Sequence, residues 1–175
     1  MEFLGALKER IPDYAKDVRL NLDAVVSRSS LEQADALGAA LAAAFAAKSK
    51  PIVDAIRGSG QLSDVDTNAA LSAAALMGMN NVWYPYVEMA NDEDLRTQRA
   101  ELRMNAYATH GGVDKKRFEL FALAASIVGK CHFCVASHYK MLKENGMTAQ
   151  QLRDVGRIAA VVTAAGNAFA AEGDR

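Results

Sequence analysis

Alanine-rich segments with apolar residues every three or four positions limit the fold of this chain more than any other feature. This spacing runs along most of the sequence. It corresponds to one face of an α-helix, and alanine has the highest helix propensity of all residues. Runs of β-branched residues are short, so there is almost no strand signal. We therefore expect an all-α, multihelical fold.

Capping residues and glycines predict where several helices begin and end. The segment Ser30–Gln33 has the form of a capping box and should open a long helix that reaches about Lys48. A helix that starts after Ser63 should reach Met77 and then continue or kink past Gly78. Further helix starts are expected at Asp114, near Cys131 and at Thr148, where Thr148–Gln151 resembles a second capping box.

Length, charge and hydropathy narrow the class of protein. A chain of 175 residues fits one domain, spanning residues 1–175, and a net charge of -1 argues against nucleic acid as a main partner. The N-terminus lacks the apolar run of a signal peptide, and no segment reaches the ~18 uncharged apolar residues of a membrane span. We therefore expect a reducing, cytoplasmic compartment and no membrane. There, a lone C-x-x-C is more often catalytic or metal-binding than structural.

Cys131 and Cys134 are the only cysteines of the chain, and they form a C-x-x-C motif that His138 follows. If a helix begins near Cys131, these side chains at i, i+3 and i+7 lie on one face. The free N–H groups and the dipole at a helix N-terminus stabilise a thiolate, and a nearby imidazole can accept the thiol proton. The spacing therefore predicts a redox-active dithiol with its own base.

Glu119 is the carboxylate best placed to join this site. It belongs to the helix predicted before the motif, and Gly129 separates that helix from the next. If the two helices pack antiparallel, the carboxylate can reach the dithiol or His138, where it would orient the imidazole ring. This pair and the two cysteines would combine a proton relay with a dithiol. Such a set is enough to reduce a peroxide or to exchange disulfides.

Other interpretations of these residues stay open at this stage. A structural zinc site normally has four ligands, and the chain has no second C-x-x-C, although His132 and His138 could supply two nitrogen ligands. His132 would be rotated away from the face that carries the cysteines, so it is only a secondary candidate for the site. The cysteines could also be buried and inert, and Glu119 could be an ordinary solvated helix residue.

A weak internal repeat relates residues 75–81 to residues 126–132. In this alignment Asn80 stands where the second segment has Cys131. One explanation is a duplicated helical unit that kept its chemistry only in the second copy. The other is that two alanine-rich helices resemble each other by composition alone, and the sequence does not decide between them.

Glu119, the C-x-x-C and His138 form an E…C-x-x-C-x-x-x-H pattern. This pattern resembles the signature of the alkylhydroperoxidase D (AhpD) family, within the wider carboxymuconolactone decarboxylase-like superfamily. The likeness extends to Pro12–Asp17, Met77–Tyr84 and Leu102–Asn105, and so covers nearly the whole chain. That extent favours AhpD proper over its shorter relatives, because the signature alone would support only the superfamily.

The resemblance implies an all-helical subunit with two related helical units, assembled as a homotrimer with exchanged helices. We assign the degenerate unit to about residues 30–90 and the catalytic unit to about residues 113–171. AhpD proteins reduce hydroperoxides with their dithiol, and the resemblance implies no bound cofactor and no metal. Their electrons come from dihydrolipoyl groups, as in dihydrolipoamide, on a 2-oxo-acid dehydrogenase component and pass to the peroxiredoxin AhpC.

The resemblance also implies a role for each site residue. Cys134 would be oxidised by peroxide to a sulfenic acid, and Cys131 would be its proton donor and disulfide partner. Glu119 and His138 would complete the relay, whereas His132 follows the first cysteine instead of preceding the second, which leaves it without an implied role. The helix dipole alone would instead favour Cys131 as the activated thiol. Burial of Cys131 by the helix that carries Glu119 would reconcile the two assignments.

The sequence therefore predicts a thiol-dependent alkyl hydroperoxide reductase and electron carrier. The first alternative is a carboxymuconolactone decarboxylase-like enzyme, whose chemistry needs an acid or base but no dithiol, so the C-x-x-C weighs against it. The second alternative is a non-enzymatic metal-binding or interaction protein, which stoichiometric zinc would favour.

Overall fold

The computed structural model of the chain describes residues 2–173. Within these residues the regular elements are all helical and no β-strand is present, which confirms the predicted all-α class. The α-helices are α1 (Glu2–Glu9), α2 (Lys16–Ser27), α3 (Gln33–Ala46), α4 (Lys50–Gly58), α5 (Asp64–Ala90), α6 (Glu93–Thr97), α7 (Ala106–Thr109), α8 (Lys115–Gly129), α9 (His132–Glu144) and α10 (Ala149–Glu172). Two 3-10 turns, η1 (Asp13–Ala15) and η2 (His110–Gly112), complete the set.

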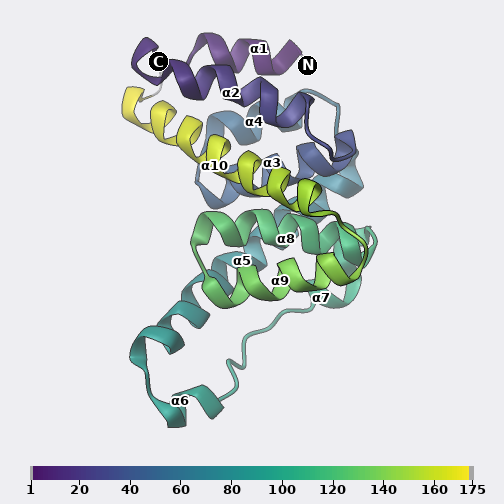
Figure 1. The fold of residues 1–175 in the computed structure, drawn as a ribbon, viewed down its shortest axis with the longest axis vertical. Coiled ribbons are helices and arrows are strands. Elements are labelled where there is room, and N and C mark those ends of the chain that lie inside the picture. The colour runs from purple at the N-terminus through teal and green to yellow at the C-terminus, as the bar shows by residue number, and fades with distance from the viewer. Residues whose placement is uncertain (1, 174–175) are drawn as a thin grey trace.

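Helices α3 and α8 form the centre of the molecule. Residues 36–44 of α3 and residues 118–126 of α8 are all buried, so both helices are enclosed around their full circumference. They approach closely at Gly38, where a Cβ atom would lie 2.2 Å from the ring of Phe121. Helix α5 packs against both, α10 crosses them, and α9 lies along α8 (Figure 1). The fold therefore places α9 at the edge of a rigid core.

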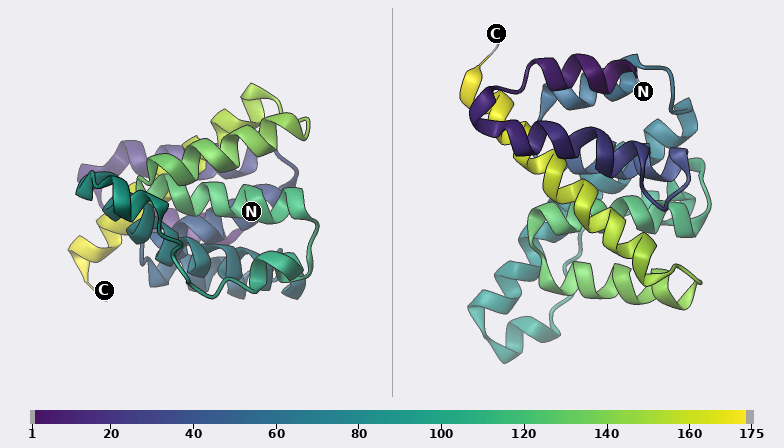
Figure 2. Two further views of the ribbon diagram at one scale, coloured as in Figure 1. Left: turned by 90° about the horizontal axis from the view of Figure 1, so that it is seen from below. Right: turned by 45° about the horizontal axis from the view of Figure 1, so that its top comes forward.

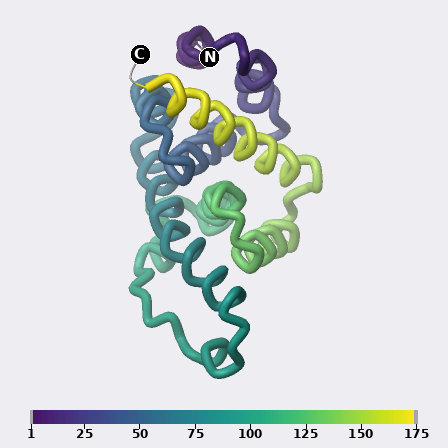
Figure 3. The backbone as a smooth tube through the Cα atoms, turned by 90° about the vertical axis from the view of Figure 1, so that its left-hand side faces the viewer, coloured from purple at the N-terminus to yellow at the C-terminus, as the bar shows by residue number. Residues whose placement is uncertain are grey.

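The second half of α5 leaves this core. The helix continues past Gly78 to Ala90 without ending, which decides between the two courses expected for it. The chain then returns through α6, and we call residues 82–105 the arm. No residue of the arm is buried, and it projects from one end of the molecule (Figure 3). Helix α1 and the end of α10 lie at the opposite end (Figure 2).

Three of the predicted helix starts are confirmed by their cap hydrogen bonds. The side chains of Ser63, Asp114 and Thr148 each accept a bond from the backbone N–H three residues later. Thr148 also forms the full capping box, in which the Gln151 side chain accepts from the backbone N–H of Thr148. These bonds are local, so the sequence alone could identify them.

The capping box predicted at Ser30 is wrong. Helix α3 starts two residues later than expected, with Glu32 as an N-cap whose side chain makes no cap hydrogen bond. The backbone N–H and the hydroxyl of Ser30 both donate to Oδ2 of Asp154 at 2.8 Å. Asp154 is a buried carboxylate of α10, and a buried charge requires partners more than a solvated helix end does. A long-range contact thus outweighs the local cap.

The turns that precede α4 and α9 have the same backbone conformation. Lys48 and Lys130 both adopt the left-handed region, with φ of 58° and 55°, and Ser49 and Cys131 follow as N-caps. In each turn the lysine N–H bonds three residues back and the next N–H five residues back. The structure thus pairs Cys131 with Ser49. The sequence alignment set Asn80 against Cys131 instead, but Asn80 lies inside α5 rather than at a turn.

Candidate active site

The turn between α8 and α9 positions the C-x-x-C motif. Helix α8 ends at Gly129, Lys130 caps it in the left-handed conformation, and Cys131 is the N-cap of α9. A Cβ atom at Gly129 would lie 2.1 Å from Nδ2 of Asn81, so only glycine allows α5 to approach this closely. Asn81 in turn donates to the carbonyl of Ala125. The turn reverses the chain, and α9 packs back along α8.

Cys131 and Cys134 are joined by a disulfide, with their Cα atoms 5.3 Å apart. The backbone N–H of Cys134 donates to Sγ of Cys131 at 3.2 Å, which is the N-cap bond of α9. Cys131 is fully buried, and its sulfur lies 3.8 Å from the carbonyl oxygen of Asn80. The structure therefore describes the oxidised form of the dithiol, with its first sulfur enclosed between α9 and α5.

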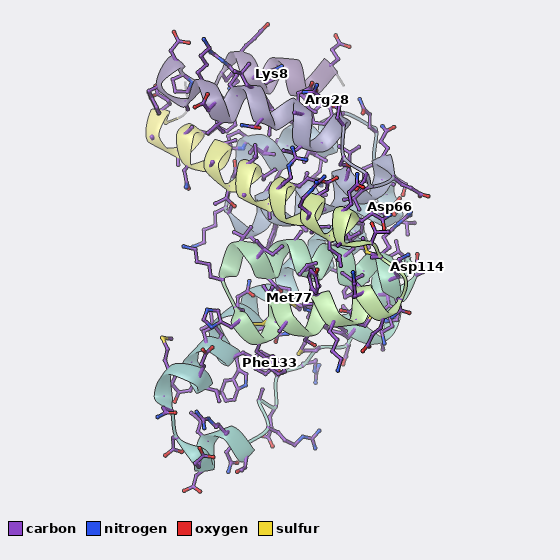
Figure 4. All side chains as sticks on the ribbon, in the orientation of Figure 1. Lys8, Arg28, Asp66, Met77, Asp114 and Phe133 are labelled. Atoms are coloured by element: carbon purple, nitrogen blue, oxygen red, sulfur yellow. A yellow bond between two sulfur atoms is a disulfide. The ribbon has the colours of Figure 1, made fainter. Side chains whose placement is uncertain are left out.

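Glu119 and His138 meet behind the disulfide. Oε2 of Glu119 lies 2.5 Å from Nδ1 of His138, and both side chains are buried. The other ring nitrogen, Nε2, lies 3.3 Å from Sδ of Met77, which is labelled in Figure 4. Burying a carboxylate or an imidazole without a hydrogen-bond partner costs free energy, and here the two groups are each other's partner. The antiparallel packing expected of α8 and α9 produces this contact.

A cavity of about 300 Å³ opens beside this pair. Cys134 and His138 both line it, whereas Cys131 does not. Its walls are formed by Asn80, Tyr84, Met104, Tyr107, Phe133, Cys134, Ser137 and His138. A molecule that enters the cavity therefore meets the second sulfur of the disulfide and the imidazole, within a largely aromatic wall.

His132 is the predicted candidate that the structure leaves exposed, away from this cavity. Its side chain is 81% exposed, and Nδ1 lies 3.1 Å from Oε1 of Glu88 on the arm. The neighbouring Phe133 stacks on Tyr84 of α5, with ring centroids 4.2 Å apart. Figure 4 shows Phe133 at the end of α9 that faces the arm. The two residues between the cysteines thus hold the start of α9 against α5.

Tyr107 and Met104 are cavity residues that sequence reasoning did not single out. Met104 lies at the end of the arm and Tyr107 in α7, and the ring of Tyr107 packs edge-on against Phe118 with centroids 5.5 Å apart. Burial, then the charge of Glu119 and then Tyr84, raise the pKa of Tyr107 above its usual value. Met104 lies in a stretch that carries the family resemblance, but its distance in sequence from the motif hid its place in the site.

The assembled residues can carry out thiol–disulfide chemistry with proton transfer. The dithiol can take up or release two electrons, and the carboxylate–imidazole pair can accept and return a proton next to it. Within residues 2–173, no three His, Cys, Asp or Glu side chains are grouped closely enough to hold a metal ion. In the same residues no helix is long and apolar enough to cross a bilayer.

Comparison with known proteins identifies the family. Residues 93–173 match the model of the carboxymuconolactone decarboxylase family. A Rhodospirillum centenum protein named alkyl hydroperoxide reductase AhpD is 43% identical over 171 residues, which cover 97% of this chain and 91% of the relative. Proteins of the same name from Rhodopseudomonas palustris and Maricaulis maris are 42% and 40% identical, covering 91% and 97% of this chain and 88% and 98% of theirs. The chain therefore belongs to the AhpD family of alkyl hydroperoxide reductases, which are oxidoreductases.

Proposed function

We propose that this protein reduces organic hydroperoxides with the Cys131–Cys134 dithiol and carries electrons between a dihydrolipoyl donor and a peroxiredoxin. One observation carries the proposal. A disulfide that can be opened and closed lies beside a buried carboxylate–imidazole pair, and the second sulfur and the imidazole share a cavity. Named relatives that match over nearly the full chain support the same activity.

In the oxidative half of the cycle, the reduced Cys134 reacts with the peroxide. Its thiolate attacks the terminal oxygen, so an S–O bond forms, the O–O bond breaks, and sulfur is oxidised to a sulfenic acid while the peroxide is reduced to an alcohol. Cys131 then attacks this sulfur, which forms the S–S bond and releases water. His138, oriented by Glu119, accepts the thiol protons and returns them to the departing oxygens.

The assignment of Cys134 as the peroxide-reactive cysteine rests on accessibility. Cys134 lines the cavity, whereas Cys131 is fully buried under α5 and does not. The dipole at the start of α9 would favour a thiolate at either sulfur, since both belong to its first turn. Access, rather than acidity, therefore favours the second cysteine as the first to react.

The reductive half of the cycle needs a donor that can enter the same cavity. A dihydrolipoyl group is a small dithiol on a flexible stem, and its thiolate would attack the disulfide at Cys134, the sulfur that lines the cavity. The resemblance to AhpD leads us to propose a lipoylated 2-oxo-acid dehydrogenase component as the donor and AhpC as an acceptor. No tightly bound cofactor takes part in this scheme.

The test is an assay of peroxide consumption by the pure protein. Dihydrolipoamide should support turnover of an organic hydroperoxide, and addition of a peroxiredoxin should increase it. Thioredoxin or glutathione in place of dihydrolipoamide serves as the control for donor choice. If dihydrolipoamide neither reduces the disulfide nor supports turnover, with or without a peroxiredoxin, the proposal is wrong.

We also propose that the chain assembles as a helix-exchanged homotrimer. The arm has no buried residue and exposes Val82, Tyr86 and Met89. An apolar hollow of about 770 Å³, with Phe45 and Val82 in its wall, opens where the arm leaves the body. Apolar surfaces of this size seldom remain exposed to solvent, and a second copy of the chain would cover both the arm and the hollow.

The two helical units remain part of this proposal. Residues 30–90 contain α3, α4 and α5, and residues 113–171 contain α8, α9 and most of α10. The matching turns at Ser49 and Cys131 support a duplication in which only the second unit has cysteines. The hydroxyl of Ser49 is buried without a hydrogen-bond partner among the described residues.

A further inference from the structure

Tyr107 is a cavity residue whose hydroxyl has no structural task in the described part of the chain. Its ring is fixed edge-on against the buried Phe118, the neighbour of Glu119 in α8. None of the hydrogen bonds among residues 2–173 involves its hydroxyl group. Because the same side chain lines the cavity together with Cys134 and His138, the phenol group is available to a molecule bound there.

Peroxide reduction requires a proton donor for the leaving oxygen, and the Glu119–His138 relay does not fully supply one. When the O–O bond breaks, the leaving oxygen departs as an alkoxide, which is a strong base and requires a proton. In the oxidised form both nitrogens of His138 are engaged, Nδ1 with Glu119 and Nε2 with Met77. A second donor that faces the cavity would stabilise the charge on the leaving oxygen as it develops.

We propose that Tyr107 is a further catalytic residue, whose hydroxyl donates a hydrogen bond to the leaving oxygen of the peroxide. This inference rests on the proposed function. The thiolate of Cys134 forms the S–O bond, the O–O bond breaks, and the alkoxide takes a proton through Tyr107. The thiol of Cys134 releases its proton to the His138–Glu119 pair when it ionises, and this proton restores the Tyr107 phenol, so the net products are a sulfenic acid and an alcohol.

The surroundings of Tyr107 keep it in the form that this role needs. Burial and the nearby charge of Glu119 raise the pKa of the phenol, so the group remains an O–H donor over the range in which thiols ionise. A phenolate could not donate a hydrogen bond to the leaving oxygen, and its negative charge would repel the thiolate of Cys134.

Other polar groups of the cavity fit the role less well. Ser137 is exposed, so water competes for its hydroxyl. Tyr84 stacks on Phe133, which is itself exposed, whereas Tyr107 packs on the fully buried Phe118. The amide of Asn80 can donate a hydrogen bond but cannot give up a proton at neutral pH. Tyr107 is the donor of the cavity that combines partial burial, a fixed ring and a transferable proton.

The test uses Tyr107→Phe, which removes the hydroxyl and keeps the ring that packs on Phe118. The protein is first reduced with dihydrolipoamide, and the loss of its two thiols is followed by stopped flow after mixing with one of two peroxides. tert-Butyl hydroperoxide releases an alkoxide, whereas peracetic acid releases a carboxylate that needs no proton. We expect the variant to react at least about tenfold more slowly with tert-butyl hydroperoxide and nearly normally with peracetic acid.

The matched control is Tyr139→Phe, an exposed tyrosine of α9 outside the cavity, which should match wild type with both peroxides. Equal slowing of Tyr107→Phe with both peroxides would mean that the residue only supports the structure, and no slowing would mean that it has no role. Either result overturns the inference while wild-type activity upholds the proposed function. If neither peroxide oxidises the wild-type dithiol, the proposed function falls and the inference with it.

Discussion

Nδ1 of His138 lies 2.5 Å from Oε2 of Glu119, and both side chains are less than a tenth exposed. The two residues come from different helices, α8 and α9, which the turn at Lys130 brings together. Because water has little access to either group, each depends on the other for its hydrogen bond. The pair should therefore behave as one acid–base unit.

The first prediction concerns this unit. Glu119→Gln and His138→Gln should each lower peroxide turnover by ~100-fold, because general base assistance typically contributes that much. The double variant should be little slower than either single variant, since groups that act as a unit do not give additive losses. The defect should shrink at high pH, where hydroxide forms the thiolate without help. Turnover against pH for all four proteins measures this.

Glu144→Gln, an exposed carboxylate on α9, is the matched control and should leave turnover unchanged. Circular dichroism should show unchanged helicity in every variant. Losses that multiply in the double variant and stay constant with pH would mean that the two residues act independently.

The second prediction separates the two cysteines. In Cys131→Ser, peroxide should convert Cys134 to a sulfenic acid that persists, because its disulfide partner is missing, and dimedone should label it. In Cys134→Ser the remaining thiol is buried away from the cavity and should react slowly. Mass spectrometry of the labelled proteins gives both results, and wild type should instead lose two thiols without labelling. Preferential labelling of Cys134→Ser would reverse the assignment of the two sulfurs.

The elements that could be predicted from sequence are those stabilised by nearby residues. The caps at Ser63, Asp114 and Thr148 close within one helical turn, so their residue types suffice to locate them. Ser30 has an equally good cap pattern, yet its hydroxyl bonds to Asp154, which lies on the last helix. The arm was not predicted either, because no local sequence pattern in α5 indicates where the helix leaves the core.

The site shows the same division. Spacing along one helix is enough to predict that Cys131, Cys134 and His138 share the site. The chain reversal at Gly129 is enough to add Glu119. Cys131 is fully buried, and its sulfur lies against the carbonyl of Asn80 in α5, a contact that the spacing of the motif does not indicate. Tyr107 could not be found by spacing, because it reaches the cavity from α7 through contacts that only the fold creates.

The third prediction concerns the contact that displaced the Ser30 cap. Burial alone would raise the pKa of Asp154, but hydrogen bonds from Ser30, Arg153 and Arg157 hold it well below its usual range. Asp154→Asn removes a buried charge with several donors and should lower the free energy of unfolding by about 2 kcal/mol, since both arginines are partly solvated. Chemical denaturation at neutral pH measures the loss.

The pH dependence of this loss has a definite sign. A carboxyl group whose pKa is lowered by folding stabilises the protein above its unfolded pKa, about 3.9, and that contribution disappears as pH falls through the folded pKa. The difference between wild type and Asp154→Asn should thus be constant from pH 7 to about 5 and shrink in stronger acid. Asp13→Asn, whose exposed carboxylate pairs with Arg19, should change stability by less than about 0.5 kcal/mol. A difference that grows on acidification would contradict this account of Asp154.

The last prediction tests the assembly through one residue of the arm. Val82 is 69% exposed and lines the apolar hollow, so a charge there costs little in a single chain. If a second copy covers the hollow, Val82→Glu would bury that charge at a cost of several kcal/mol, roughly the scale for an unpaired buried carboxylate, and should dissociate the trimer. Val65→Glu is the matched control, since this valine of α5 is 52% exposed but lies outside the hollow. Sedimentation at micromolar concentration should show trimers for wild type and Val65→Glu and smaller species for Val82→Glu. A wild-type protein that sediments as a monomer would mean that the arm and the hollow remain open to solvent and that the proposed trimer does not form.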